Sequence, residues 1–389
     1  MKIDWRSHGI LGLAAAALAI FSPSAVEATP QFARMYRVDC SSCHSAPPKL
    51  NQRGEDFLAR GYRFDDMPPL PSHQTVPLAV WNTGDIEYRR AQNLTKAYPG
   101  RVEIVSGGIL AGTRAWYFIE WRPLSLHIGA RNRLLNRSGR FEDAVVSVPL
   151  GRGNSLGLAV GQFRALSQVD VSRRLSLSEP LAFSAGIPDP RAPTRPRLTA
   201  LRAFSPSARQ PGLRLLYQRA AGTRAADGWY SALTLPLTGE LTIPFTDAAS
   251  FEFEARPKGV FGESYLRKGL TSLGGHVFVG DRRSLGNFVV TSDVTRRWSV
   301  LGAVGFDRSR DVARARFSVG GEYVVHPLVI VGGRVDHRTG QNRDPAVFVY
   351  ANGHLPFGPD WFRQALRVQF EQTLQSGNLR SAMALSHIF

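Results

Sequence analysis

The sequence has little cysteine and no long uninterrupted apolar run. Its 389 residues contain two cysteines, Cys40 and Cys43. This excludes a small exported scaffold built on several disulfides, and one bond between cysteines three residues apart would close a loop too small to stabilise much. No stretch after the N-terminal segment approaches the roughly 18 consecutive apolar residues of a transmembrane helix. The sequence therefore predicts no membrane-spanning helix.

Acidic residues are also few, at 31 Asp and Glu against 48 Lys and Arg, for a net charge of +17. The basic residues are mostly arginine and are scattered along the chain instead of clustering with stacking aromatic residues, so no nucleic-acid partner is predicted. Arginine facing a lumen would favour anions, and arginine near loops would bind phosphates of membrane lipid. An arginine-rich composition on a solvated face is the other interpretation.

Both cysteines fall in one motif, Cys40-Ser41-Ser42-Cys43-His44. Two cysteines at this spacing can form thioethers to both vinyl groups of one haem, and His44 can then ligate the iron. A redox dithiol would need a surrounding βαβ pattern, which the sequence lacks. A zinc site would need more ligands, and only the distant His73 is available. The motif predicts one covalently attached haem c, held by Cys40, Cys43 and His44.

The N-terminus has the features of an export signal, which haem c attachment requires. Lys2 and Arg6 are basic, residues 10 to 21 are apolar, and Val26-Glu27-Ala28 has the small-residue pattern of a cleavage site. We therefore predict a signal peptide over residues 1–28, with the mature chain beginning near Thr29.

Three residues are candidates for the second axial iron ligand: Met67, His73 and Met35. Met67 lies in a proline-rich stretch, Asp65-Asp66-Met67-Pro68-Pro69, which resembles the methionine loop of many small cytochromes c. We favour Met67 over His73; a methionine ligand would raise the reduction potential relative to histidine. The predicted cofactor-binding residues are thus Cys40, Cys43, His44 and Met67, with His44 and Met67 as the metal ligands.

The segment over residues 29–75 is predicted to contain one clear helix, from residue 52 to 60. Asn51 can cap its start and Gly61 can end it in a left-handed conformation. Gly54, Phe57 and Gly61 share one side, where the glycines would let the helix approach a haem ring; an ordinary helix with two tolerated glycines is the alternative. Because the segment is too small to enclose a haem alone, we expect it to plug a barrel mouth or lumen.

Residues 76–389 show period-two alternation, typical of β-strands with one apolar and one polar face. Residues 313 to 319 alternate Ala or Phe and Val with Arg and Ser, and residues 366 to 371 alternate apolar residues with Arg367, Gln369 and Glu371. Such alternation fits a soluble sandwich or barrel as well as a transmembrane barrel.

Three features favour the membrane barrel. Many strands reach the roughly 9 to 11 residues that a tilted strand needs to cross a bilayer. Aromatic residues gather near strand ends, as at Trp116 and Phe118 or Phe348 and Tyr350, as in interfacial girdles. The chain ends on an alternating strand with terminal Phe389, which resembles the last strand of outer-membrane barrels. We predict an all-β fold, a transmembrane antiparallel β-barrel of about 16 strands over residues 76–389 with a small helical haem c plug.

Residues 165 to 211 interrupt this pattern with seven prolines, among them Pro180, Pro188 and Pro206. Because proline is excluded from interior strands, we expect a long extracellular or inward-folded loop, with a short strand over residues 181–187.

The N-terminal segment resembles a known family. Residues 30 to 34 (PQFAR) leading into the Cys40 motif, followed by residues 48 to 51 (PKLN), Gly54, Phe57 and Gly61-Tyr62, are similar to the fused monohaem cytochrome-porins of the bacterial outer membrane, of which the best-known members are iron(II) oxidases. The resemblance is specific over residues 30–62 and architectural over the barrel. It implies an outer-membrane location, with both barrel termini in the periplasm, and an electron route across that membrane.

The function expected from these features is electron transfer from extracellular Fe(II), or an iron chelate, through the haem to a periplasmic c-type cytochrome. That would make the protein an iron(II) oxidase surrounded by outer-membrane lipid. The alternative is an anion-selective porin whose haem plug is structural or sensory. A soluble periplasmic cytochrome with a β-domain is a third possibility.

Overall fold

A computed structural model describes most of the chain after the predicted signal peptide. The described residues are 30–46, 49–64, 66–69, 77–89, 94–110, 113–128, 134–136, 138–150, 155–166, 204, 206, 209–221, 224–242, 250–280, 283–295, 297–309, 312–339, 345–357, 364–376 and 378–388. The predicted signal peptide, His73, the predicted strand over residues 181–187 and Phe389 lie outside these residues.

The N-terminal segment contains two short helices and a small hairpin. Its elements are α2 (Pro30–Tyr36), the 3-10 turn η1 (Cys40–Ser42), β1 (His44–Ala46), β2 (Lys49–Leu50) and α3 (Gln52–Ala59). The Asn51 side chain accepts a hydrogen bond from the Gly54 backbone at 3.0 Å, and Gly61 follows the helix with φ +67°. The predicted helix and both of its caps are confirmed. In the part of the chain that is described, neither helix has the length or apolarity needed to cross a bilayer.

The remaining described elements are strands of one closed barrel. They are β3 (Leu78–Arg89), β4 (Leu94–Ile109), β5 (Trp116–Ile128), β6 (Leu134–Asn136), β7 (Arg140–Leu150), β8 (Leu156–Arg164), β9 (Arg209–Ala220), β10 (Gly228–Thr242), β11 (Ser250–Pro257), β12 (Val260–Lys268), β13 (Thr271–Gly280), β14 (Arg283–Asp293), β15 (Trp298–Ser309), β16 (Val312–His326), β17 (Val329–Arg338), β18 (Ala346–Phe357), β19 (Gln364–Gln375) and β20 (Asn378–Ile388).

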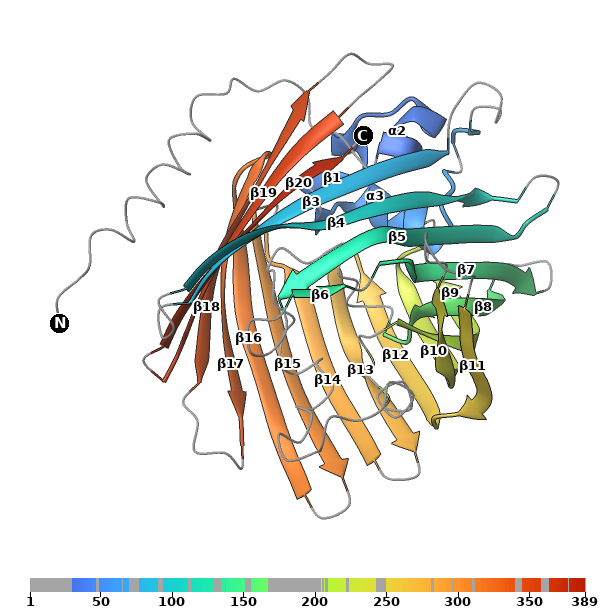
Figure 1. Ribbon diagram of the computed structural model, residues 1–389. Helices are drawn as coiled ribbons and strands as arrows, with labels where there is room; N and C mark the ends of the chain where they lie inside the picture. Colours follow the sequence, from blue (N-terminus) through green and yellow to red (C-terminus); the bar gives the residue numbers. More distant parts are fainter. Residues whose placement is uncertain are drawn as a thin grey trace.

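The wall is antiparallel throughout and closes where β20 pairs with β3 (Figure 1). Two of the eighteen strands, β6 and β11, are not needed to close the wall. β5 also pairs directly with β7, and β10 also pairs directly with β12. Removing β6 and β11 leaves sixteen strands in the wall among the described residues. The predicted antiparallel barrel of about 16 strands is confirmed.

Along the strands, inward-facing side chains, many of them polar, alternate with outward-facing apolar side chains. On β19, Arg367, Gln369 and Glu371 are buried inside the barrel. On β16, Phe317 and Val319 face outward and are 37% and 64% exposed. Further exposed outward residues are Val160, Leu233, Phe288, Val304, Phe306 and Val349. A soluble barrel would place its apolar side chains inside, so this surface is the kind that faces lipid.

The predicted aromatic girdle is wrong at Phe348 and Tyr350. Tyr350 is buried and donates a hydrogen bond to Glu322 at 3.2 Å, while Phe348 lies under the Arg334 guanidinium at 4.2 Å. Both therefore face the interior, because a period-two pattern does not say which face of a strand is the inner one. Trp229 and Trp298, each within a residue of a strand start, are exposed aromatic residues.

The long proline-rich segment enters the barrel at its described residues. Leu166 and Phe204 are buried in the same apolar cluster as Phe261 and Phe278, and Phe204 stacks on Phe278 with ring centroids 3.8 Å apart. The Leu166 backbone donates to the Pro206 carbonyl at 2.9 Å. At these positions the inward-folded form of the predicted loop is confirmed.

Candidate functional site

The Cys-x-x-Cys-His motif forms a tight turn that leads into a hairpin. Cys40 to Ser42 make one 3-10 turn, and the Ser42 backbone donates to the Asp39 carbonyl at 3.0 Å. His44 begins β1 and pairs with Leu50 of β2. The hairpin therefore fixes His44 against the start of α3.

Asn51 fastens the motif to α3. Its backbone N–H donates to the Cys43 carbonyl at 2.8 Å, and its side-chain Nδ2 donates to the carbonyls of Ser41 and Ser42 at 2.9 and 3.2 Å. The same side chain caps the helix through Gly54. The sequence predicts that Asn51 caps the helix. It does not predict the hydrogen bonds from Asn51 to Ser41 and Ser42, because these depend on how the hairpin folds back on the motif.

Cys43 lies inside this turn and is 7% exposed. Burial raises the pKa of its thiol to about 11, an effect that the nearby Arg53 guanidinium partly offsets. A Cβ at Gly54 would lie 2.1 Å from the Cys43 carbonyl oxygen. Gly54 thus lets α3 pack closely on the backbone of the motif; the approach of this helix to a haem ring stays a prediction.

The apolar side of α3 is occupied by aromatic rings. Phe57 contacts Phe32, Tyr36 and Phe64, with ring centroids 5.2, 5.4 and 4.6 Å apart. The Tyr36 hydroxyl donates to the Tyr62 carbonyl at 2.7 Å. This cluster is the only apolar core that the described part of the segment possesses, and it continues into the barrel wall.

Tyr62 connects the aromatic cluster around Phe57 to β5. Its ring stacks on Phe118 and meets Trp116 edge-on, with centroids 5.4 Å apart in both cases. A Cβ at Gly61 would lie 2.2 Å from the Trp116 indole. Trp116 and Phe118 are therefore docking residues for the segment; the sequence pattern had assigned them to a lipid-facing girdle.

Three ion pairs hold the segment to other strand ends. Lys49 contacts Asp293 at 2.9 Å, Asp56 contacts Arg224 at 3.3 Å, and Glu55 contacts Arg267 at 3.9 Å. Asp56 also accepts from the Ala226 backbone at 2.8 Å. These partners lie at the end of β14, before β10 and at the end of β12, so the contacts span much of the rim.

The segment lies at the end of the barrel where β3 begins and β20 ends (Figure 1). The contacts above confirm that the segment lies at one mouth of the barrel and packs on its wall; that the wall also helps to enclose a haem stays a prediction. Below, "the plug" means the described residues between Pro30 and Pro69.

The candidates for the second axial ligand differ in position. Met67 is half-buried, and its neighbour Asp66 pairs with Arg53 at 3.1 Å. Arg53 belongs to the first turn of α3, so this pair links the stretch that contains Met67 to that helix. Met35 instead lies against Gly108 of β4.

The chemistry of the plug suits a haem c. One turn provides two cysteines for thioethers and an imidazole for iron, and the cluster around Phe57 supplies apolar walls. Gln31 is fully buried, and neither of its amide atoms has a hydrogen-bond partner. Buried amides are normally satisfied, so Gln31 is a donor and acceptor that a bound polar group would satisfy.

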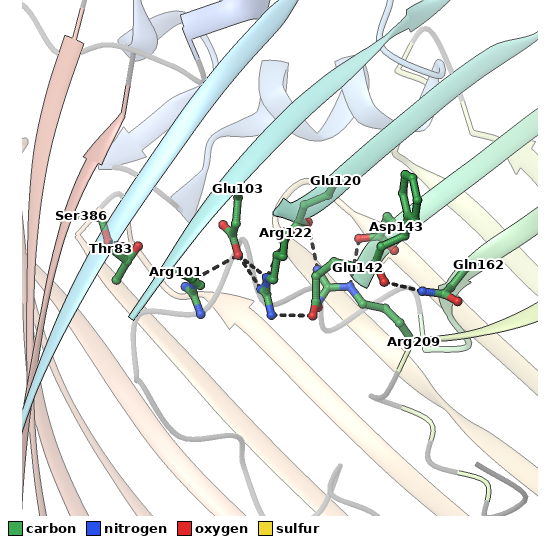
Figure 2. Close-up of polar contacts among 11 residues, drawn as sticks. Thr83, Arg101, Glu103, Glu120, Arg122, Glu142, Asp143, Gln162, Arg209 and Ser386 are labelled. Atoms are coloured by element: carbon green, nitrogen blue, oxygen red, sulfur yellow. Dashed lines mark hydrogen bonds and ion pairs between the residues drawn. The ribbon is translucent and has the colours of Figure 1, made fainter. Parts of the chain in front are cut away.

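A second group of polar side chains lines the inner wall across β4, β5, β7 and β9 (Figure 2). Arg122 pairs with Glu103 at 2.5 Å and also with Glu142. Arg209 pairs with Glu120 at 3.0 Å, with Asp143 at 3.1 Å and with Glu142. Arg101 pairs with Glu103 at 3.0 Å.

This wall network nearly neutralises itself, with three guanidinium groups against four carboxylates. Breaks in register occur beside Glu103 and beside Glu120, where bulges re-aim side chains along a strand. The sequence could not predict the network, because Arg209 is 67 positions from its partner Glu142. Its residues tie four strands together on the inner face of the wall.

No family model matches the chain, and no curated protein matches it either. Its fold matches solved bacterial barrels. The Salmonella typhi OmpF complex with daunomycin has a TM-score of 0.51 at 10% identity over 80% of this chain and 97% of that one. The barrel has the porin fold.

Two further structures have lower TM-scores. The outer membrane channel DcaP of Acinetobacter baumannii gives a TM-score of 0.47 at 11% identity, covering 81% of this chain and 97% of that one. The anion-selective porin from Comamonas acidovorans gives 0.48 at 12% identity, covering 80% and 98%. These likenesses concern the barrel.

Proposed function

We propose that the protein is an outer-membrane cytochrome-porin that transfers electrons from extracellular Fe(II), or an iron chelate, to a periplasmic c-type cytochrome. The observation that carries this proposal is the position of the motif. Cys40, Cys43 and His44 lie in a plug that is bound to the mouth of a porin-like barrel by aromatic packing and three ion pairs.

The outer surface supports a membrane location. Apolar side chains such as Leu233, Phe288 and Phe306 are more than half exposed on the outside of the wall, and exposing them to water would be costly. Bacterial barrels that cross a membrane do so in the outer membrane. The proposal places the plug and both ends of the barrel on the periplasmic side.

The chemistry requires one electron for each iron ion. Each Fe(II) that becomes Fe(III) releases one electron, and a periplasmic cytochrome takes it up. When bound, haem c supplies a one-electron centre whose potential depends on its axial ligands. His44 and Met67 would hold the iron, Cys40 and Cys43 would hold the porphyrin, and the cluster around Phe57 would exclude water.

A haem held well inside the lumen would be within reach of either mouth, because the apolar band of an outer-membrane barrel is only about 25 Å tall. The plug lies at one rim, and the lumen leads from it to the other. No acid or base is needed for an outer-sphere electron transfer, so the wall network of Figure 2 has a structural role in this proposal.

An anion-selective porin is the second candidate. It is favoured by the buried inward-facing arginines, among them Arg214, Arg316 and Arg334. Rings of arginine in a pore select for anions. In this case the plug would be structural or sensory.

Anaerobic addition of Fe(II) to the purified, oxidised holoprotein tests the leading proposal. We expect the visible spectrum to change to that of ferrous haem c, and the midpoint potential to be high enough for Fe(II) to be a donor. A haem that stays oxidised with Fe(II) at every pH tested, while the protein passes small anions through a bilayer, would leave the porin as the better account.

A further inference from the structure

Two buried polar side chains on the inner wall lack hydrogen-bond partners in the part of the chain that is described. Tyr265 of β12 is 1% exposed, and its hydroxyl has no partner. His276 of β13 is 5% exposed, and neither of its ring nitrogens has one. Buried polar groups are normally hydrogen-bonded, so these two side chains indicate a site for a bound group.

The two residues are neighbours on the same face of the wall. β12 and β13 lie side by side (Figure 1). Tyr265 pairs with Gly274, which is two residues before His276 on β13. A Cβ at Gly274 would lie 2.7 Å from Cδ1 of Tyr265, so the tyrosine ring lies over this glycine. Diagonal neighbours of this kind are within reach of aromatic side chains.

Glu263 and Tyr230 extend this group. Glu263 pairs directly with His276 in the β12–β13 register, and it lies two residues from Tyr265 on the inner face of β12. Tyr230 of β10 pairs with Tyr265, and its hydroxyl donates a hydrogen bond to Glu263 at 3.3 Å. Both are buried. Two phenols, a carboxylate and an imidazole therefore share one region of three adjacent strands, and we call these four residues the phenol cluster.

The phenol cluster lies close to the plug. Arg267 is two residues from Tyr265 on the same face of β12, which is about 7 Å along a strand. Arg267 contacts Glu55 of the plug at 3.9 Å, and its guanidinium lies 5.5 Å from the centre of the Tyr230 ring. The cluster is therefore on the inner wall near the end of the barrel that holds the plug.

Apolar side chains surround the phenol cluster. Both of its tyrosines belong to the same buried apolar cluster as Phe261 and Phe278. The His276 ring lies against Phe261, with ring centroids 5.2 Å apart. Such surroundings exclude water, and the attraction between a metal ion and charged ligands is stronger where water is excluded.

We infer that the phenol cluster binds one Fe(III) ion. Fe(III) is a hard ion of high charge that prefers anionic oxygen ligands, and imidazole is also a common ligand of iron. Within the described residues no three His, Cys, Asp or Glu side chains gather as a metal site. Here Glu263 and His276 supply two ligands of those types, and the two tyrosines supply the oxygens that favour Fe(III).

The charges balance when Fe(III) binds. A ligand must lose its proton to bind a metal, so each phenol becomes a phenolate and two protons leave for the solvent. Two phenolates and the Glu263 carboxylate carry three negative charges, which match the charge of Fe(III). The imidazole of His276 binds as a neutral nitrogen ligand, and the Arg267 guanidinium stabilises the phenolate of Tyr230.

This inference deepens the proposed function by naming where iron is held. A site that binds Fe(III) more tightly than Fe(II) favours the oxidised ion, because a ligand shifts an equilibrium by its differential affinity for the two states. Fe(II) at this site would therefore give up its electron more readily. That role rests on the proposed electron transfer, whereas Fe(III) binding by the phenol cluster does not.

Addition of Ga(III) to the detergent-solubilised holoprotein tests the site. Ga(III) has the charge of Fe(III) and a similar size but exchanges no electrons with a haem, and it is supplied as its nitrilotriacetate chelate. We expect one Ga(III) to bind, and the ultraviolet difference spectrum at saturation to show two ionised tyrosines.

Tyr265→Phe tests the assignment of the ligands. It removes only a hydroxyl that has no partner, so the barrel should fold and keep its heat-modifiable migration in gels. We expect it to lose half of the tyrosinate signal and to bind Ga(III) about tenfold or more weakly, because even residues that only support a metal ligand contribute about that much. Tyr217→Phe is the matched control. Tyr217 is exposed on the outer face of β9, so its loss should change neither quantity.

His276→Ala gives a second variant, which keeps both phenols. We expect it to weaken Ga(III) binding and to leave the tyrosinate signal at saturation unchanged. No tyrosinate signal from the wild-type protein, or undiminished signal and affinity in folded Tyr265→Phe protein, would overturn the site. Because this assay involves no redox step, failure of Fe(II) oxidation would leave its result standing.

Discussion

Single residues decide whether the plug carries a haem. Cys40 and Cys43 make up the whole thiol content of the chain. Hydrogen bonds from the Asn51 side chain hold the turn between them. Single substitutions can therefore test both the covalent attachment of the haem and the second axial ligand of its iron.

The first prediction concerns attachment. Haem should stay with the polypeptide in a denaturing gel, and Cys40→Ala or Cys43→Ala should abolish or sharply reduce haem staining, because each removes one thioether. Ser41→Ala lies between them in an exposed position and should leave the stain unchanged. Haem that is lost from the wild-type chain on denaturation would contradict covalent attachment.

The second prediction concerns the second axial ligand. Thioether sulfur bound to ferric haem gives a charge-transfer absorption band that bis-histidine haem lacks. Met67→Ala should remove that band and lower the midpoint potential, while His73→Ala and Met35→Ala should change neither. If His73→Ala had these effects instead, His73 would be the ligand.

At the scale of elements, the plug depends on contacts between segments far apart in the sequence. β2 and α3 supply Lys49, Glu55 and Asp56, and each pairs with a different part of the rim. The Lys49–Asp293 pair is largely buried, with 13% and 14% of the two side chains exposed. Removing one partner of such a pair leaves an uncompensated charge.

The third prediction follows from this pair. Lys49→Glu places two acids together, which should weaken plug docking by about 3 kcal/mol or more and raise the ionic conductance of the protein in planar bilayers. The double variant Lys49→Glu with Asp293→Lys restores opposite charges and should return the conductance toward the wild-type value. Equal conductance in all three proteins would show that this pair does not hold the plug in place.

At the scale of the whole molecule, local patterns predicted much of the fold and less of the site. Alternation along β16 and β19 predicts strands, and outward Phe317 and Val319 agree with a lipid-facing wall. The same alternation did not show that Tyr350 faces the interior, because which face of a strand lines the lumen depends on how all the strands close into the barrel. The motif around Cys40 consists of consecutive residues, so it can be recognised in the sequence without knowing how the strands pair.

The sequence could not predict contacts between strands that are far apart in the chain. The wall network joins Arg209 to acids on β5 and β7, and bulges near Glu103 and Glu120 shift which side chains meet. Pairing of Arg316 with Arg338 likewise follows from strand register. Period-two patterns show that such residues share a face, but register and closure decide which of them are neighbours.

The most direct test of the central claim is electron transfer across a membrane. Holoprotein is reconstituted into vesicles that enclose oxidised cytochrome c, and Fe(II) is added outside. The account predicts that the enclosed cytochrome becomes reduced, and that His44→Ala stops this while the barrel keeps its heat-modifiable migration. Vesicles that pass small anions freely while the enclosed cytochrome stays oxidised would contradict the account.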